Sequence, residues 1–175
     1  MRFLLTGSSG FIGQYLHRHL LNAGHTVFTL KARAFGSEQQ TKWLNYCRSI
    51  RPSAIIHLAG LAHRHSPRSA ESVQQLLMVN VRFPLELAAI AVQAAIPRFV
   101  FVSSIGVHGS QTHIGFPFRE ESPFNPGNLY AASKCEAELQ LQDLLVSTLT
   151  RLVIVRPALV LSLIHISEPT RPERI

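Results

Sequence analysis

Acidic residues and cysteines are scarce in this 175-residue chain. It holds a single aspartate, Asp143, no acidic residue before Glu38, and 10 Asp and Glu in total against 17 Lys and Arg. Because the basic residues are scattered singly, without a run or an arginine-rich helix face, we expect small anionic ligands and no nucleic-acid partner. The two cysteines, Cys47 and Cys135, are too few for a disulfide framework and lack metal-site spacing, which suits a reducing cytoplasm.

Long hydrophobic runs are also missing. The first five residues lack the long apolar core of a signal peptide. The apolar stretch 152–166 is interrupted by Arg156 and Pro157, which makes it a poor membrane span. Apolar residues still make up 46% of the chain, and its length suffices for one domain with a real core but not comfortably for two. We therefore expect one globular domain and no membrane partner.

The stretch 2–13 combines a short apolar run, a turn of small residues and the start of an amphipathic segment. Gly7 can take backbone angles that a side chain forbids, Gly10 lets the backbone approach a diphosphate, and Gly13 allows close packing of helix on strand. The free N–H groups and the positive dipole end of the helix then face the anion. The alternative is a plain turn, since Gly and Ser also make turns without a ligand.

Strands and helices alternate along the rest of the chain. Apolar runs predict strands at 26–30, 54–58, 98–102 and 150–155, and helical spacing predicts helices at 11–23, 38–49, 70–95 and 128–146. Asn80 and Pro84 are candidate bend points in the longest helix, and 105–127 reads as a long loop. This order predicts an α/β fold with a doubly wound parallel sheet, in which ligands bind beyond the carboxyl ends of the strands.

Tyr130 and Lys134 are spaced four residues apart and share one helix face. An ammonium beside a phenol favours the phenolate and lowers a pKa that is otherwise near 10. Such a tyrosine serves as general base or acid in an alcohol–ketone interconversion, and the Ser104 hydroxyl could bind the same oxygen. The alternative is an exposed helix pair without a catalytic role.

Six motifs carry a family resemblance: TGSSGFIG, HLAG (57–60), the VNV-containing helix around Asn80, VSSIGVHG (102–109), YAASK and VRPALV (155–160). In this order they resemble the extended short-chain dehydrogenase/reductase superfamily over nearly all of residues 1–160. Residues 99–134 are most similar to NAD(P)-dependent epimerases and dehydratases of nucleotide-diphosphate sugars, such as UDP-hexose 4-epimerases and the 4-keto-sugar reductases of polysaccharide synthesis. The resemblance implies a Rossmann-type domain, a nucleotide-sugar substrate and a homodimer through the two long helices.

The same resemblance implies a role for individual residues. Tyr130 is the acid/base, Lys134 is its pKa partner and a ribose ligand, and Ser104 anchors the substrate oxygen. The residues implied to bind the cofactor, besides Tyr130 and Lys134, are Gly7, Gly10, Phe11, Ile12, Gly13, Leu58, Ala59, Gly60, Asn80 and Pro157.

The chain departs from the family pattern at three places. Where many NAD-preferring members carry an aspartate that holds the ribose hydroxyls, this chain has Lys31, with Arg33 nearby. Cations there can accept a 2′-phosphate, so NAD and NADP are both candidates and NADP is slightly favoured, although a solvated loop pair is an equal alternative. Phe35 and Gly36 stand where the family often has an aspartate near adenine. His108 replaces a tyrosine of many epimerases, which favours the keto-reductase branch a little.

The nine histidines raise the question of a metal site. His57, His63 and His65 are close in sequence, but His57 lies in an apolar strand run, and no acidic ligand accompanies the other two. A core histidine is the commoner state at such a position, and we expect no metal.

The chain is expected to divide at residue 160. Residues 1–160 correspond to the NAD(P)-binding domain, whereas 161–175 resemble the translation of a sequencing adapter more than the glycine-rich loop of the family. On this hypothesis the C-terminal part that completes the family's sugar-nucleotide pocket is absent; the alternative is that 161–175 are a divergent native C-terminus. The leading function is an NAD(P)-dependent oxidoreductase or epimerase; the alternative is a truncated or non-catalytic dinucleotide-binding module.

Overall fold

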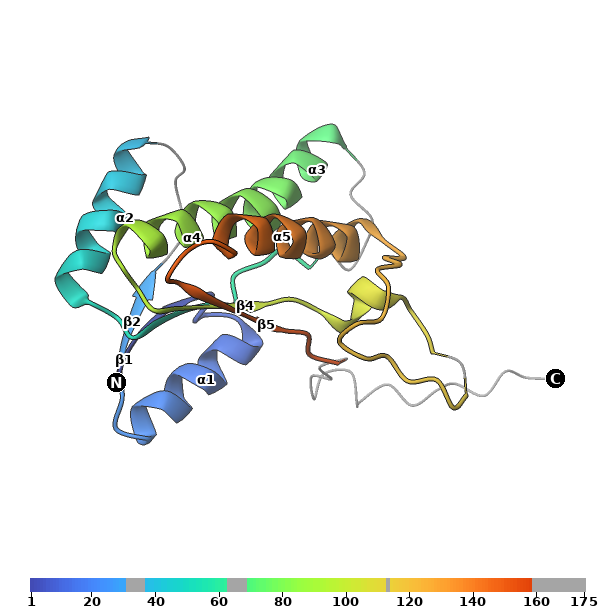
Figure 1. The fold of residues 1–175 in the computed structure, drawn as a ribbon, viewed down its shortest axis with the longest axis horizontal. Coiled ribbons are helices and arrows are strands. Elements are labelled where there is room, and N and C mark those ends of the chain that lie inside the picture. Colours follow the sequence, from blue (N-terminus) through green and yellow to red (C-terminus); the bar gives the residue numbers. More distant parts are fainter. Residues whose placement is uncertain (31–36, 63–68, 113, 159–175) are drawn as a thin grey trace.

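Five strands form one parallel sheet in the computed structural model, which describes residues 1–30, 37–62, 69–112 and 114–158 (Figure 1). The spatial order is β2-β1-β3-β4-β5. The strands are β1 (Arg2–Thr6), β2 (Thr26–Leu30), β3 (Ala54–His57), β4 (Arg98–Val102) and β5 (Arg151–Val155). The predicted parallel α/β sheet is confirmed, and the apolar runs that predicted its strands agree with the observed bounds to within one residue.

The helices also follow the predicted pattern, with one interruption. They are α1 (Phe11–Asn22), α2 (Ser37–Ile50), α3 (Ala70–Leu77), α4 (Phe83–Gln93) and α5 (Leu129–Leu145). The expected long helix 70–95 contains a π-helical segment, Met78–Arg82, which includes Asn80. Pro84 lies in the first turn of α4, where its missing N–H is tolerated. The loop 105–127 contains a short 3-10 helix, Ile105–His108, that the sequence did not predict.

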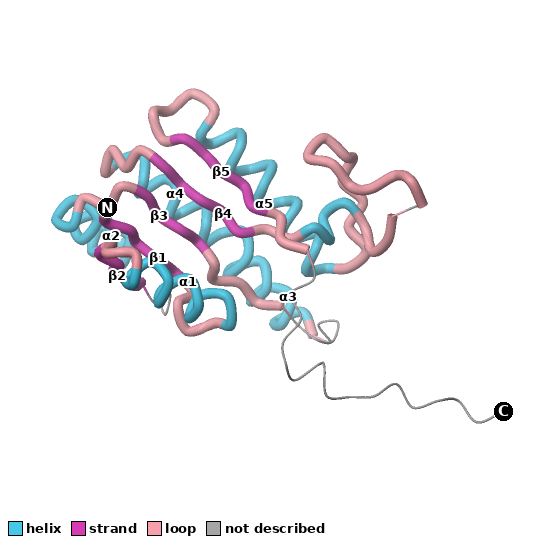
Figure 2. Tube along the Cα trace, turned by 90° about the horizontal axis from the view of Figure 1, so that it is seen from below, coloured by secondary structure: helices cyan, strands magenta, loops and turns pink. Residues whose placement is uncertain are grey.

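The direction of the crossovers decides which face each helix covers. The chain steps one way from β1 to β2 and the opposite way from β2 through β3 and β4 to β5. Because such crossovers are right-handed, α1 lies on one face of the sheet, and α2, α4 and α5 lie on the other (Figure 1). Figure 2 shows the sheet from the α1 side, with β5 at one edge. The reversal between β1 and β3 is a switch point of the kind where ligands bind.

The core lies between the sheet and the layer of α2, α4 and α5. Phe99 and Phe101 of β4 are fully buried there, and Trp43 of α2 packs against Phe83 of α4 with ring centroids 5.4 Å apart. The segment Ala70–Gln93 is long and apolar enough to cross a membrane by length and composition alone. In this protein half of its most apolar window is buried, and α4 contributes to the core cluster.

Candidate active site

The glycine turn after β1 leaves no room for a side chain at Gly7 or at Gly13. Gly7 has a φ of +72°, and a Cβ there would lie 2.6 Å from the Ala59 nitrogen. A Cβ on Gly13 would lie 2.0 Å from the Gly7 oxygen, so this glycine lets α1 approach the turn. The Gly10 N–H donates to the Gly7 carbonyl at 3.0 Å and closes the turn.

The N-terminus of α1 opens toward this turn. No side chain caps the helix, and its first turn contains no acidic residue. The N–H groups that no side chain caps and the positive end of the helix dipole therefore suit a diphosphate. The donors present fit the pyrophosphate of a dinucleotide.

His57 joins the two strands that flank the switch point. Its Nδ1 lies 2.8 Å from the Thr6 hydroxyl, and its ring is fully buried beside Phe101. Burial, and secondarily the charge of Lys134, lowers the pKa of His57 to about 3, so the imidazole is neutral. Within the described residues no cluster of three potential metal ligands occurs. His63 and His65 lie outside the described residues.

The first turn of α5 carries Tyr130. The Asn128 side chain accepts a hydrogen bond from the Ala131 N–H at 2.8 Å, which caps the helix and sets where it begins. One turn further on, Lys134 is only 2% exposed. Its ammonium donates to the Val102 carbonyl at 2.9 Å and lies 4.6 Å from the centroid of the Phe101 ring.

The pKa values of Lys134 and Tyr130 respond mainly to burial. Burial lowers the pKa of Lys134 to about 8, while the Glu138 carboxylate acts in the opposite direction. Burial raises the pKa of Tyr130 above its usual value. The expected lowering of the Tyr130 pKa by Lys134 is not seen.

The segment after β4 places Ser104. Its hydroxyl accepts a hydrogen bond from the Gly106 N–H at 3.1 Å and caps the 3-10 helix. The flanking amides are held by the end of β5: Ser103 donates to Val155 at 2.8 Å, and Ile105 donates to Pro157 at 3.0 Å.

One cleft of about 780 Å³ connects the glycine turn to the face of α5. It brings together most of the predicted site residues: Gly7, Gly10, Phe11, Ile12, Gly13, Leu58, Gly60, Ser104, Tyr130, Lys134 and Pro157. Ala59 and Asn80 do not line it. Asn80 lies behind the wall, accepting from the Leu61 N–H at 2.8 Å and donating to the Ser133 hydroxyl at 3.0 Å.

Other predicted residues lie elsewhere. Lys31 and Arg33, the residues that favour NADP, lie outside the described residues, as do Phe35, Gly36 and the tail 161–175. His108 is buried and lines a separate cavity of about 970 Å³ along β5. The side chain that replaces the tyrosine of many epimerases therefore does not line the cleft.

Several lining residues have no role assigned from the sequence, although Ser103 follows a predicted strand, at a position where ligands are expected. Ser103 is 3% exposed, and its hydroxyl has no hydrogen-bond partner among the described residues. Gly106, Gly109 and Ser110 follow it along the wall, and Ala62 lies across the cleft. The VSSIGVHG motif marks most of these residues, but which of them face the cleft depends on the turn into the 3-10 helix.

Comparison with known proteins identifies the family. A model of the NAD dependent epimerase/dehydratase family matches residues 3–173. A UDP-glucose 4-epimerase of Vibrio cholerae is 32% identical over 167 residues, covering 90% of this chain and 51% of the relative. A GDP-6-deoxy-D-mannose reductase of Pseudomonas aeruginosa is 31% identical over 139 residues, covering 78% and 45% respectively.

A solved structure supports the same assignment. The UDP-glucose 4-epimerase of Thermus thermophilus, determined in complex with NAD, matches with a TM-score of 0.75 at 27% identity. The match covers 89% of this chain and 54% of that structure. The chain spans about half the length of the curated relatives it matches. On the family match, the chain belongs to the NAD-dependent epimerase/dehydratase family.

Proposed function

We propose that the whole protein is an NAD(P)-dependent 4-epimerase or 4-keto-reductase of a nucleotide-diphosphate sugar. The observation that carries this proposal is the single cleft that joins a diphosphate-binding turn to Ser104, Tyr130 and Lys134. The named relatives, a UDP-glucose 4-epimerase and a GDP-6-deoxy-D-mannose reductase, support the substrate class. A reducing cytoplasm and a homodimer through the helices 70–95 and 128–146 remain predictions.

The cofactor would occupy the cleft with its diphosphate on the N-terminus of α1. When bound, the nicotinamide supplies an acceptor and donor of hydride. Gly7, Gly10 and Gly13 let the backbone approach the diphosphate, and Pro157 borders the far end of the cleft. Leu58, Ala59 and Gly60 are assigned to the adenosine side, and Asn80 supports the wall behind them.

Proton transfer is assigned to Tyr130. Its raised pKa keeps the phenol protonated at neutral pH, so it is a proton donor to a carbonyl oxygen in the reductive direction. Ser104 is assigned to hold that oxygen. Lys134, with a pKa of about 8, remains mostly cationic at neutral pH. That its charge favours the phenolate formed after the proton has left is a prediction from the family resemblance, since burial alone shifts the pKa of Tyr130 here.

A Tyr130→Phe substitution in the whole protein tests this role. We expect a loss of turnover of about 100-fold or more, since general acid–base catalysis contributes on this scale. Cofactor binding, followed by fluorescence, should change little. Tyr15→Phe is the control, because Tyr15 is an exposed tyrosine of α1 that does not line the cleft. Undiminished turnover in Tyr130→Phe would reject the assignment.

Cofactor preference is tested by titrating the chain with NADH and NADPH in parallel. Lys31 and Arg33 favour NADP, whereas the solved relative from Thermus thermophilus holds NAD. If the two cations accept a 2′-phosphate, Lys31→Ala should weaken NADPH binding and leave NADH binding unchanged. Equal loss for both cofactors would contradict this preference.

The second candidate is a dinucleotide-binding module without turnover. What supports it is that the cleft already contains both the glycine turn and the α5 face, while the chain spans 51% of the Vibrio cholerae relative. This candidate predicts saturable cofactor binding by the 175-residue chain and no turnover of any nucleotide sugar.

A further inference from the structure

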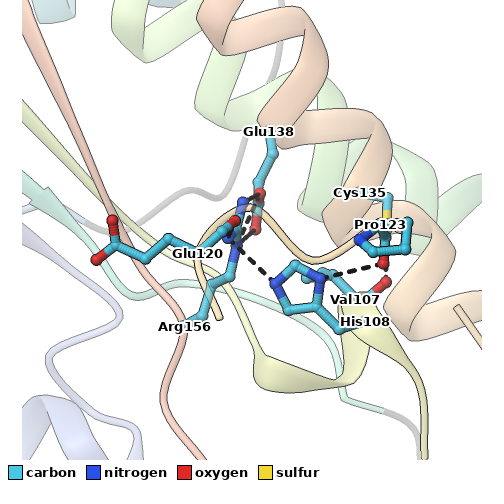
Figure 3. Close-up of polar contacts among 7 residues, drawn as sticks. All are labelled: Val107, His108, Glu120, Pro123, Cys135, Glu138 and Arg156. Carbon is cyan, nitrogen blue, oxygen red and sulfur yellow. Dashed lines mark hydrogen bonds and ion pairs between the residues drawn. The ribbon is translucent and has the colours of Figure 1, made fainter. Parts of the chain in front are cut away.

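An ion pair outside the cleft connects three segments of the fold (Figure 3). Arg156 donates to both carboxylate oxygens of Glu138, at 2.7–3.1 Å, and the two side chains are 16% and 0% exposed. The same guanidinium donates to the Glu120 carbonyl at 2.9 Å, lies 3.2 Å from Nε2 of His108, and lies 5.5 Å from the Phe124 ring centroid. Arg156 therefore contacts α5, the 3-10 helix and the loop that follows it.

The backbone around this arginine holds the segment of the proposed oxygen anchor. The carbonyls of its two neighbours, Val155 and Pro157, accept hydrogen bonds from Ser103 and Ile105, at 2.8 and 3.0 Å. Those two amides lie on either side of Ser104. The position of the serine is thereby coupled through the backbone to the position of the arginine.

The carboxylate partner continues the proposed catalytic face of α5. Tyr130, Lys134 and Glu138 follow one another at spacings of four residues and lie along one side of the helix. The Glu138 charge reaches Lys134, whose pKa it raises against the effect of burial. A second contact ties the same helix to the 3-10 helix, because the Cys135 thiol donates to the Val107 carbonyl at 3.6 Å.

We propose that Arg156 and Glu138 form a positioning pair that holds the Ser104 segment in place beside the Tyr130–Lys134 face of α5. Neither side chain lines the cleft, so the pair acts on the reaction through the residues it places. This inference rests on the proposed function for its effect on turnover. Its effects on the backbone and on Lys134 are independent of any substrate.

His108 extends the contacts of the pair to the loop. Its Nδ1 lies 3.3 Å from the Pro123 carbonyl and donates there, so Nε2 is the acceptor for Arg156. The arginine is thereby connected to the loop through the histidine ring as well as through the Glu120 carbonyl.

The test uses a double substitution that leaves no buried charge unpaired. Glu138→Met with Arg156→Met replaces the pair by apolar side chains, an exchange that buried ion pairs often tolerate. We expect amide hydrogen exchange at Ser103 and Ile105 to accelerate by about tenfold or more, because the segment opens locally. In the whole protein we expect kcat to fall by about 10- to 100-fold, with cofactor affinity nearly unchanged, since small misplacements of catalytic groups have effects of this size.

A single substitution separates positioning from bulk stability. Glu138→Gln removes the charge and keeps the shape, so the Lys134 ammonium, followed by NMR of its side chain, should titrate at a lower pH than in the wild type. The matched control replaces Lys42 and Glu38 by Met; this pair of α2 has an N···O distance of 2.6 Å but is 63% and 86% exposed. The control should leave exchange, the Lys134 titration and kcat unchanged.

The outcomes distinguish this inference from the proposed function. Unchanged exchange at Ser103 and Ile105 in the double variant would overturn the positioning role, and so would an unchanged Lys134 titration in Glu138→Gln. A fall in cofactor affinity as large as the fall in kcat would also overturn the positioning role, because it would indicate a general loss of structure. If the wild-type protein turns over no nucleotide sugar, the proposed function fails, and the exchange and titration results still decide the role of the pair.

Discussion

At the scale of single residues, the glycines at the two ends of α1 differ in what a methyl group would meet. A Cβ at Gly13 would lie 2.0 Å from the Gly7 oxygen, whereas a Cβ at Gly24 meets nothing within 4 Å. We expect Gly13→Ala to lower the free energy of unfolding by about 3 kcal/mol or more and to weaken cofactor binding. Gly24→Ala should cost about 1–2 kcal/mol, because of its φ of +75°, and leave binding unchanged. Urea unfolding, followed by the fluorescence of the buried Trp43, measures both. Wild-type stability in Gly13→Ala would contradict the packing.

Lys134 makes stability depend on pH in a defined window. Its pKa falls from 10.5 to about 8 on folding, because of burial. Below about pH 8, Lys134 is protonated in both the folded and the unfolded state. Burial of its charge then lowers the free energy of unfolding by a constant amount of about 3 kcal/mol. Between about pH 8 and 10.5 the unfolded chain binds more protons than the folded protein, so the contribution of Lys134 to stability rises with pH.

A Lys134→Met variant isolates this contribution. Below about pH 8 the variant should have a larger free energy of unfolding than the wild type, because it buries no charge at this position. This difference should shrink by about 3 kcal/mol between about pH 8 and 10.5. Cys47, whose pKa burial raises to about 11, makes stability fall between about pH 9 and 11, but equally in both proteins, so its effect cancels in the difference. Urea unfolding across this range tests the expectation, and a pH-independent difference would contradict it.

At the scale of elements, one cap determines where α5 begins and hence where Tyr130 lies. Asn128→Ala removes the acceptor of the Ala131 N–H and should cost about 1 kcal/mol of stability. Ser69→Ala is the matched control, because Ser69 caps α3 in the same way, with its side chain accepting from Ser72 N–H at 3.2 Å. We expect similar losses of stability in urea, but reduced turnover of the whole protein only in Asn128→Ala. Equal turnover in the two variants would show that the cap does not matter for Tyr130.

The elements also show what sequence reasoning could and could not supply. Apolar runs and caps act locally, so the strands and the starts of α1, α3 and α5 were predicted to within one residue. The π-helical segment Met78–Arg82 was not predicted, because Asn80 in this segment donates a hydrogen bond to Ser133, a residue 53 positions away. Arg156 interrupts an apolar stretch and belongs to the VRPALV motif, but neither pattern indicates its partner. Its partner Glu138 lies 18 positions earlier on another element, and only the packing of β5 against α5 brings them together.

At the scale of the whole molecule, the two faces of the sheet are covered unequally. Phe99 and Phe101 face the core, so their neighbours Val100 and Val102 face the side of α1, together with their register partners Val153 and Val155. Val153 and Val155 are 43% and 42% exposed, and within the described residues no helix covers this half of the sheet. The cleft itself opens at the carboxyl ends of β1, β3 and β4, so a ligand bound there would contact the segments that follow all three strands.

Binding in the cleft should therefore stabilise the molecule as a unit. A ligand that binds only the folded state, at 100 times its dissociation constant, adds about 2.7 kcal/mol to the free energy of unfolding. For a chain of this length that corresponds to a rise in Tm of roughly 5–10 °C. We expect NADH or NADPH to raise the Tm of the wild type and of Tyr130→Phe by this amount. In Gly13→Ala the rise should be smaller. The Tm of each protein with cofactor is compared with the Tm of the same protein without it. Thermal unfolding of the 175-residue chain with increasing cofactor measures it. The absence of any shift with both cofactors at millimolar concentration would mean that the glycine turn and the α5 face do not form a dinucleotide site in this chain.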